Sequence, residues 1–221
     1  MLKIVVLDGG FGGEIFADRL EEELPIANII RVIDWRNADL FLKSSKSARQ
    51  VADAAIRPYI GRVDLIIFAN HLVSITSLKY FRRKYQNQKF LGLKLPTPNT
   101  PSNRPTVILT TKAVTHTINY YNYIFRLKRK STTVCLDTWS RLIDDGELTE
   151  EMIGSEMTNF RGEGNFRPPE MVLACSQFND IIPIVRKIFD YNIKIYDSFD
   201  STIQEVFKTL KIRGGTGKKK S

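Results

Sequence analysis

The chain has 221 residues, of which 43% are hydrophobic and 26% charged, enough for one large globular domain or two small ones. No apolar run approaches the roughly 20 residues of a membrane-spanning helix, and the N-terminus lacks the long apolar stretch of a secretory signal, so we expect a cytoplasmic protein. Much of the net charge of +9 lies in residues 126–130 (RLKRK) and 218–220 (KKK), clusters typical of solvated faces. We therefore expect neither a nucleic acid nor a membrane as the main partner.

Two cysteines, Cys135 and Cys175, are too few for a disulfide framework. The two histidines, His71 and His116, lie far apart in the sequence, and no CxxC or Cys/His cluster is present. We therefore expect no metal site.

Apolar runs alternate with helical spacings along the first part of the chain. Strands are predicted at residues 3–7, 29–33, 64–68 and 90–93, and helices at 11–24, 47–60 and 75–84. Residues 96–105 then contain four of the nine prolines, which predicts a linker or an exposed loop.

The alternation resumes after the prolines. Strands are predicted at residues 106–110, 132–136, 171–174 and 193–196, and helices at 116–127, 150–156, 180–189 and 201–210. Cys135 lies inside one of these strands, which predicts a core position for its side chain.

This order of elements predicts an α/β fold with two similar three-layer α/β domains, mostly parallel sheets and a cleft between them. We expect a first domain from residues 1–95 plus 199–212 and a second from residues 96–198. The glycine-rich and lysine-rich residues 213–221 are expected to be a disordered basic tail.

Ligands in such folds bind at the carboxyl ends of the strands. The chemistry-bearing residues at the predicted strand ends are Asp8, Asn70, His71, Thr111, Cys175 and Ser176. The glycine loop at residues 8–13 (DGGFGG) is not GxGxxG, and no P-loop pattern is present, so we expect no nucleotide cofactor.

Several of these segments together resemble the glutamate/aspartate racemase family. That family opens with a strand and Asp-Ser-Gly-x-Gly-Gly, matched by residues 8–13 with Gly9 in place of Ser. Its third strand ends in Ala-Cys-Asn-Thr, matched by residues 68–71. Ala69 therefore stands where the first catalytic cysteine is expected, Asn70 matches, and His71 replaces Thr.

The second half of the chain continues the resemblance. Residues 91–93 and 197–198 match family landmarks, as do Thr111 and Tyr120 within the segment 108–120. Asp144 replaces the Glu that assists the second cysteine in the family. Cys175 matches that cysteine, with Gln177 in place of the following His. The family's Pro-Tyr-Gly-x-Lys-Ser is matched by residues 42–47 only in its last two positions.

The resemblance implies two α/β domains, no cofactor, a homodimer, and a small carboxylate or amino acid as ligand. It implies roles in proton transfer for Cys175, His71, Asp8 and Asp144. It implies substrate-binding roles for Gly9, Asn70, Thr111, Ser176 and Gln177.

Racemisation requires a base on one face of the carbon and an acid on the other, and alanine at position 69 carries no proton. The leading interpretation is therefore a degenerate racemase homologue without the two-cysteine reaction. The first alternative is a single-cysteine isomerase, racemase or decarboxylase that uses Cys175 with His71. Under the leading interpretation, His71 instead caps a helix or lines a vacated pocket. A nucleic-acid-binding or regulatory protein is a third hypothesis, based on charge alone.

Overall fold

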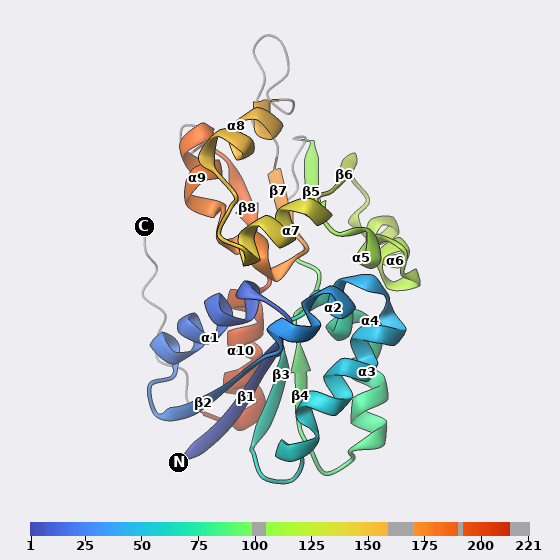
Figure 1. Cartoon of the computed structure of the whole chain (residues 1–221), viewed down its shortest axis with the longest axis vertical. Helices are drawn as coiled ribbons and strands as arrows, with labels where there is room; N and C mark the ends of the chain where they lie inside the picture. Colours follow the sequence, from blue (N-terminus) through green and yellow to red (C-terminus); the bar gives the residue numbers. More distant parts are fainter. Residues whose placement is uncertain (99–104, 159–169, 190–191, 213–221) are drawn as a thin grey trace.

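The structure is a computed structural model that describes residues 1–98, 105–158, 170–189 and 192–212. It has two lobes stacked along the long axis of the molecule (Figure 1). Each lobe is built on a four-stranded sheet with helices on both faces, and every strand pairing is parallel. The predicted α/β fold with two similar domains is therefore confirmed.

The first sheet has the strand order β2-β1-β3-β4. Its strands are β1 (Leu2–Asp8), β2 (Ala27–Ile33), β3 (Leu65–Phe68) and β4 (Phe90–Gly92). The central strands are apolar and fully buried along most of their length, because helices cover both faces of the sheet. These helices are α1 (Phe11–Glu23), α2 (Ala38–Lys43), α3 (Ser45–Ile56), α4 (His71–Lys84) and α10 (Phe199–Leu210).

The second sheet repeats the topology, with the order β6-β5-β7-β8. Its strands are β5 (Thr106–Thr110), β6 (Ser131–Cys135), β7 (Glu170–Leu173) and β8 (Lys194–Tyr196). Its helices are α5 (Lys112–Thr115), α6 (Ile118–Leu127), α7 (Asp137–Asp144), α8 (Glu150–Thr158) and α9 (Ile182–Ile188).

Alternate residues of each strand enter different apolar clusters, as the two-residue period of a strand requires. One cluster joins the lobes: it contains Val5 and Phe68 of the first sheet together with Ile108 and Val172 of the second. The opposite face of the first sheet packs on α1 and α10. The opposite face of the second sheet packs on α7, α8 and α9. The lobes therefore share a continuous core.

The strand order places two reversal points opposite each other. In an order of the type 2-1-3-4 the chain leaves the first and third strands in opposite directions, which opens a crevice at their carboxyl ends. Asp8 ends β1 and Asn70 follows β3 in the first lobe. Thr111 follows β5 and Cys175 lies two residues past β7 in the second lobe. These four candidate residues predicted from sequence thus lie at the carboxyl ends of the central strands.

Some predicted boundaries were wrong. Helix α4 begins at His71 rather than residue 75, because the Asn70 side chain accepts a hydrogen bond from the Val73 main-chain N–H at 3.1 Å. The predicted helix 116–127 corresponds to α6 alone, which begins at Ile118 because the Thr117 side chain accepts a hydrogen bond from Tyr120 N–H at 3.1 Å. Helices α2, α5 and α7 were not predicted.

The prediction that Cys135 lies in the core was also wrong. Strand β6 is the edge strand of its sheet, and the Cys135 thiol at its end is exposed. The predicted disordered tail lies outside the described residues. Among the residues that the structure describes, no helix is both long and apolar enough to cross a membrane.

Candidate functional site

The carboxyl group of Asp8 joins the two lobes. It is 2% exposed, and its Oδ1 accepts hydrogen bonds from Gly9 N–H at 2.7 Å and from the Asn70 side-chain amide at 3.0 Å. Its Oδ2 accepts a hydrogen bond from the Ser176 hydroxyl of the second lobe at 3.0 Å. Burial raises the pKa of Asp8 to about 7, although these three donors oppose the shift.

Cys175 lies directly before Ser176, but its side chain turns into its own lobe. The thiol is buried in the cluster that faces α7 and α9. Its Sγ lies 3.7 Å from the Ser140 hydroxyl and donates to the side-chain carbonyl of Gln177 at 3.4 Å. Burial raises the pKa of the Cys175 thiol to about 12, and the nearby carboxyl groups of Asp8 and Asp144 act in the same direction.

Gln177 connects the thiol to a second contact between the lobes. Its side-chain amide donates to Asp144 Oδ2 at 2.6 Å and to the Ser140 main-chain carbonyl at 3.2 Å. Asp144 Oδ1 in turn accepts a hydrogen bond from Phe11 N–H, at the start of α1 in the first lobe, at 2.8 Å. Burial raises the pKa of Asp144, while its hydrogen bonds to Phe11 and Gln177 oppose this.

The glycine loop is in tight contact with its surroundings. A methyl group on Gly12 would lie 2.4 Å from Ser176 Oγ and 2.6 Å from the Gln177 main-chain nitrogen, so the start of α1 packs directly on the second lobe. A methyl group on Gly9 would lie 2.5 Å from the ring of Phe41, a fully buried residue of α2. The space next to Gly9 and Gly12 is therefore filled by neighbouring protein atoms.

His71 is oriented by a different partner. Its ring is 3% exposed, and Nε2 lies 3.2 Å from the Ser198 hydroxyl at the start of α10. Burial lowers the pKa of His71 to about 3, against an opposing influence of the Lys94 main chain, so the ring is neutral. No described contact joins His71 to Cys175.

The structure thus brings most of the predicted site residues into two hydrogen-bonded groups that meet at the consecutive residues 175–177. One group contains Asp8, Gly9, Asn70 and Ser176, and the other contains Asp144, Cys175 and Gln177. His71 and Thr111 are also buried, but no described hydrogen bond links their side chains to either group.

Three contributing residues were not among the predicted site residues, although Ser198 was recognised as part of a family landmark. Ser140 contacts the Cys175 thiol, Phe41 covers Gly9, and Ser198 binds His71. The signal for Ser140 was available, because α7 is strongly amphipathic and residues four apart, such as Ser140 and Asp144, share one face of a helix. The positions of Phe41 and Ser198 depend on tertiary packing.

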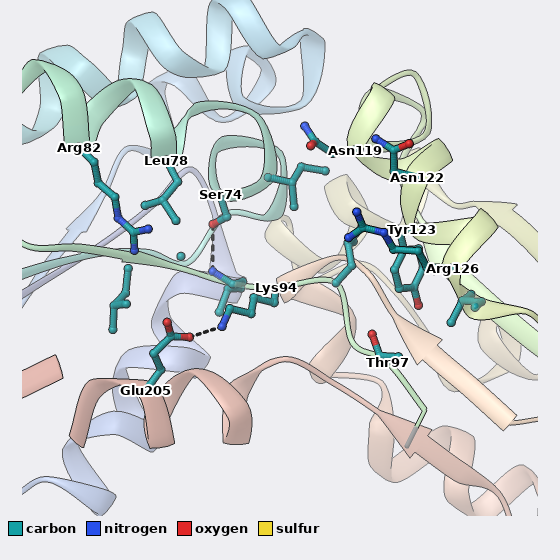
Figure 2. A pocket seen from close by; sticks show the side chains of 16 residues that line it. Ser74, Leu78, Arg82, Lys94, Thr97, Asn119, Asn122, Tyr123, Arg126 and Glu205 are labelled. Atoms are coloured by element: carbon teal, nitrogen blue, oxygen red, sulfur yellow. Dashed lines mark hydrogen bonds and ion pairs between the residues drawn. The ribbon is translucent and has the colours of Figure 1, made fainter. Parts of the chain in front are cut away.

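A cavity of about 570 Å³ lies elsewhere, between α4, the segment after β4, and α6 (Figure 2). Figure 2 shows Arg82, Lys94 and Arg126 around it. Arg82 already donates to the Phe90 carbonyl at 2.7 Å, and Lys94 pairs with Glu205 at 2.5 Å. None of the site residues predicted from sequence lines this cavity.

No metal centre is formed by the described residues: within residues 1–98, 105–158, 170–189 and 192–212, no three His, Cys, Asp or Glu side chains gather in a way that could hold an ion.

Solved racemase structures have the same fold as this chain. Escherichia coli glutamate racemase, solved with L-glutamate and the activator UDP-MurNAc-Ala, matches with a TM-score of 0.82 and 17% identity over 100% of this chain and 86% of that chain. Campylobacter jejuni glutamate racemase matches with a TM-score of 0.75 and 18% identity over 95% and 86% of the two chains. Picrophilus torridus aspartate racemase matches with a TM-score of 0.60 and 15% identity over 97% and 95%.

At the level of sequence, neither a model of a known protein family nor a curated protein matches the chain. The likeness to the racemases is therefore one of fold.

The close contact at Gly12 predicts a pair of opposite mutational effects. Gly12→Ala should lower the free energy of unfolding by about 1 to 3 kcal/mol, because the main chain of the second lobe blocks the new methyl group. Gly154→Ala, in α8 with open space around it, should raise this energy by about 0.5 to 1 kcal/mol through reduced flexibility of the unfolded chain. Urea unfolding followed by circular dichroism measures both. Equal effects of the two substitutions would contradict the proposed contact.

The burial of Asp8 predicts a pH dependence of stability. Because the folded-state pKa is raised from 3.8 to about 7, the folded state binds an extra proton between these values. The stabilisation is complete below the unfolded pKa and is lost as the pH rises through about 7. Asp8→Asn keeps the shape of the side chain and stays neutral. Its stability relative to the wild type should therefore rise by about 2 to 3 kcal/mol between pH 5 and pH 9.

The control for this measurement is Asp145→Asn, at an exposed position next to Asp144. It removes a carboxyl group without removing the contact between the lobes. Parallel wild-type and Asp8→Asn stability curves between about pH 5 and pH 9 would show that Asp8 titrates normally in the folded protein.

Proposed function

We propose that this chain belongs to the glutamate/aspartate racemase family but does not carry out the family's two-cysteine racemisation. The observation that carries the proposal is the state of Cys175. Its thiol is buried within the second lobe, where its contacts are Ser140 and Gln177, and its pKa is raised to about 12. A thiol must ionise to remove an α-proton, and burial strongly opposes that ionisation near neutral pH.

Position 69 supports the same conclusion. Ala69 is fully buried in the apolar cluster formed with α1 and α10, and its methyl group offers no exchangeable proton. His71 is a poor replacement, because burial keeps it neutral and its Nε2 is committed to Ser198 at 3.2 Å. The alternative of a single-cysteine enzyme with His71 as partner therefore requires both residues to change environment.

The packing around the glycine loop also disfavours a small carboxylate ligand. The ring of Phe41 occupies the space where a side chain at position 9 would lie. The carboxyl group of Asp144 occupies the corresponding space at Gly10, where a methyl group would lie 2.5 Å from Asp144 Oδ1. An incoming carboxylate would have to displace these groups and would approach the carboxyl groups of Asp8 and Asp144, which repel an anion when ionised.

In this racemase-like scaffold, the site between the lobes has become a structural contact. A cytoplasmic location, expected from the N-terminal sequence and the lack of long apolar runs, and a homodimer, expected from the resemblance, belong to the same proposal.

Hydrogen exchange at the α-carbon tests the proposal. The protein would be incubated with each enantiomer of glutamate and aspartate in deuterated water, and the α-proton signal followed by NMR. We expect no loss of the signal beyond the protein-free blank, because no ionised thiol faces the substrate. A glutamate racemase with both cysteines is the positive control.

The Cys175→Ala variant separates the possible outcomes. Exchange with inversion that is lost in this variant would overturn the proposal. Exchange without inversion that is lost in this variant would favour the single-cysteine enzyme. Exchange that persists unchanged in the variant would point to a contaminant.

A further inference from the structure

Helix α6 exposes three large apolar side chains. Phe125 is 84% exposed, Ile118 70% and Tyr121 63%. Figure 1 shows α6 at the outer edge of the second lobe, on the side away from α9. Scattered exposed apolar residues are ordinary, but a group on one helix marks a surface for interaction.

The three side chains share one face of the helix. Their spacing of three and four residues places them within roughly one-sixth of the helix circumference. The opposite face carries Tyr120, Tyr123 and Leu127, which are buried against the lobe. The stripe of Ile118, Tyr121 and Phe125 therefore points directly away from the protein, where a surface helix normally carries charged residues.

The chain segment that carries this stripe is basic. Residues 111–136 contain no Asp or Glu, and their charged residues are Lys112, Arg126, Lys128, Arg129 and Lys130. Arg126 ends α6, and the exposed Lys128 follows it in the left-handed conformation with φ 49°. Arg129 is the member that turns inward, to pair with Glu170 at 2.6 Å. The cations that remain exposed lie next to the end of the apolar stripe.

We propose that α6 docks the protein on the surface of an anionic phospholipid bilayer. An apolar stripe that enters the boundary between headgroups and acyl chains, flanked by cations that contact the headgroups, is the combination by which interfacial helices bind membranes. The aromatic rings of Tyr121 and Phe125 suit this boundary. The contact revises the expectation of no membrane partner, and it concerns a surface helix rather than a span.

Two other partners fit less well. A second copy of the chain, docked through α6 about a twofold axis, would bring two basic clusters together without acidic residues to compensate. Single-stranded nucleic acid binds in a positively charged groove with aromatic platforms, whereas this face is a convex helix whose stripe includes the aliphatic Ile118.

Co-sedimentation of the full chain with vesicles tests the proposal. We expect binding to vesicles of phosphatidylcholine with about 30 mol % phosphatidylserine, weaker binding to phosphatidylcholine alone, and a decrease with rising salt. Phe125→Ser should weaken binding to the anionic vesicles about tenfold, because the largest inserted side chain is lost. Lys128→Asn should weaken it about fivefold.

Matched controls are available in the first lobe. Ile26→Ser removes an apolar side chain that is 62% exposed, and Lys211→Asn removes a lysine that also follows a helix in the left-handed conformation, with φ 56°. Neither should change binding. The lysines at residues 218–220 remain in every variant, so they cannot cause a difference between variants. Circular dichroism checks that each variant is folded.

Several outcomes would overturn the proposal. These are no binding to anionic vesicles, equal losses in the α6 variants and their controls, and a dimer in solution that Phe125→Ser dissociates. Binding of a single-stranded RNA oligonucleotide that Phe125→Ser abolishes, without vesicle binding, would assign the face to nucleic acid.

Discussion

The contact that the rest of the site depends on is a single buried carboxyl group that joins two lobes. Asp8 receives hydrogen bonds from Gly9 and Asn70 of its own lobe and from Ser176 of the other. Burial favours its neutral form, so the contact avoids the large cost of an unpaired charge in the interior. The same position in the strand order would otherwise open a ligand crevice, and here it holds the lobes together.

The glycine loop packs tightly on its surroundings. Gly9 leaves room for the Phe41 ring, and Gly12 allows α1 to touch Ser176 and Gln177. Gln177 then binds Asp144, and Asp144 binds the start of α1. Asp144 and Gln177, which stand where the family pattern has Glu and His, therefore take part in direct contact between the lobes. Cys175 is buried in the second lobe beside this contact, and burial raises its pKa.

Much of this could be predicted from the sequence, because the signals are local. Continuous apolar runs such as those of β1 and β3 predict buried parallel strands. The ends of the predicted strands placed Asp8, Asn70 and Cys175 correctly at the carboxyl ends of β1, β3 and β7. The orientation of side chains at those ends could not be predicted. His71 faces Ser198 and Cys175 faces Ser140 because helices distant in sequence supply their partners. Cys135 is exposed because β6 is an edge strand, and strand order is a property of the whole fold.

The closure of the site is tested most directly by the reactivity of the two thiols in the native protein. Cys135 is exposed and serves as an internal reference, whereas Cys175 is buried at the contact between the lobes. On treatment with iodoacetamide near neutral pH, mass spectrometry of the digested protein should find Cys135 modified and Cys175 protected until denaturant unfolds the chain. Modification of both thiols at similar rates would contradict the account, because it would show an open crevice with an ionisable Cys175.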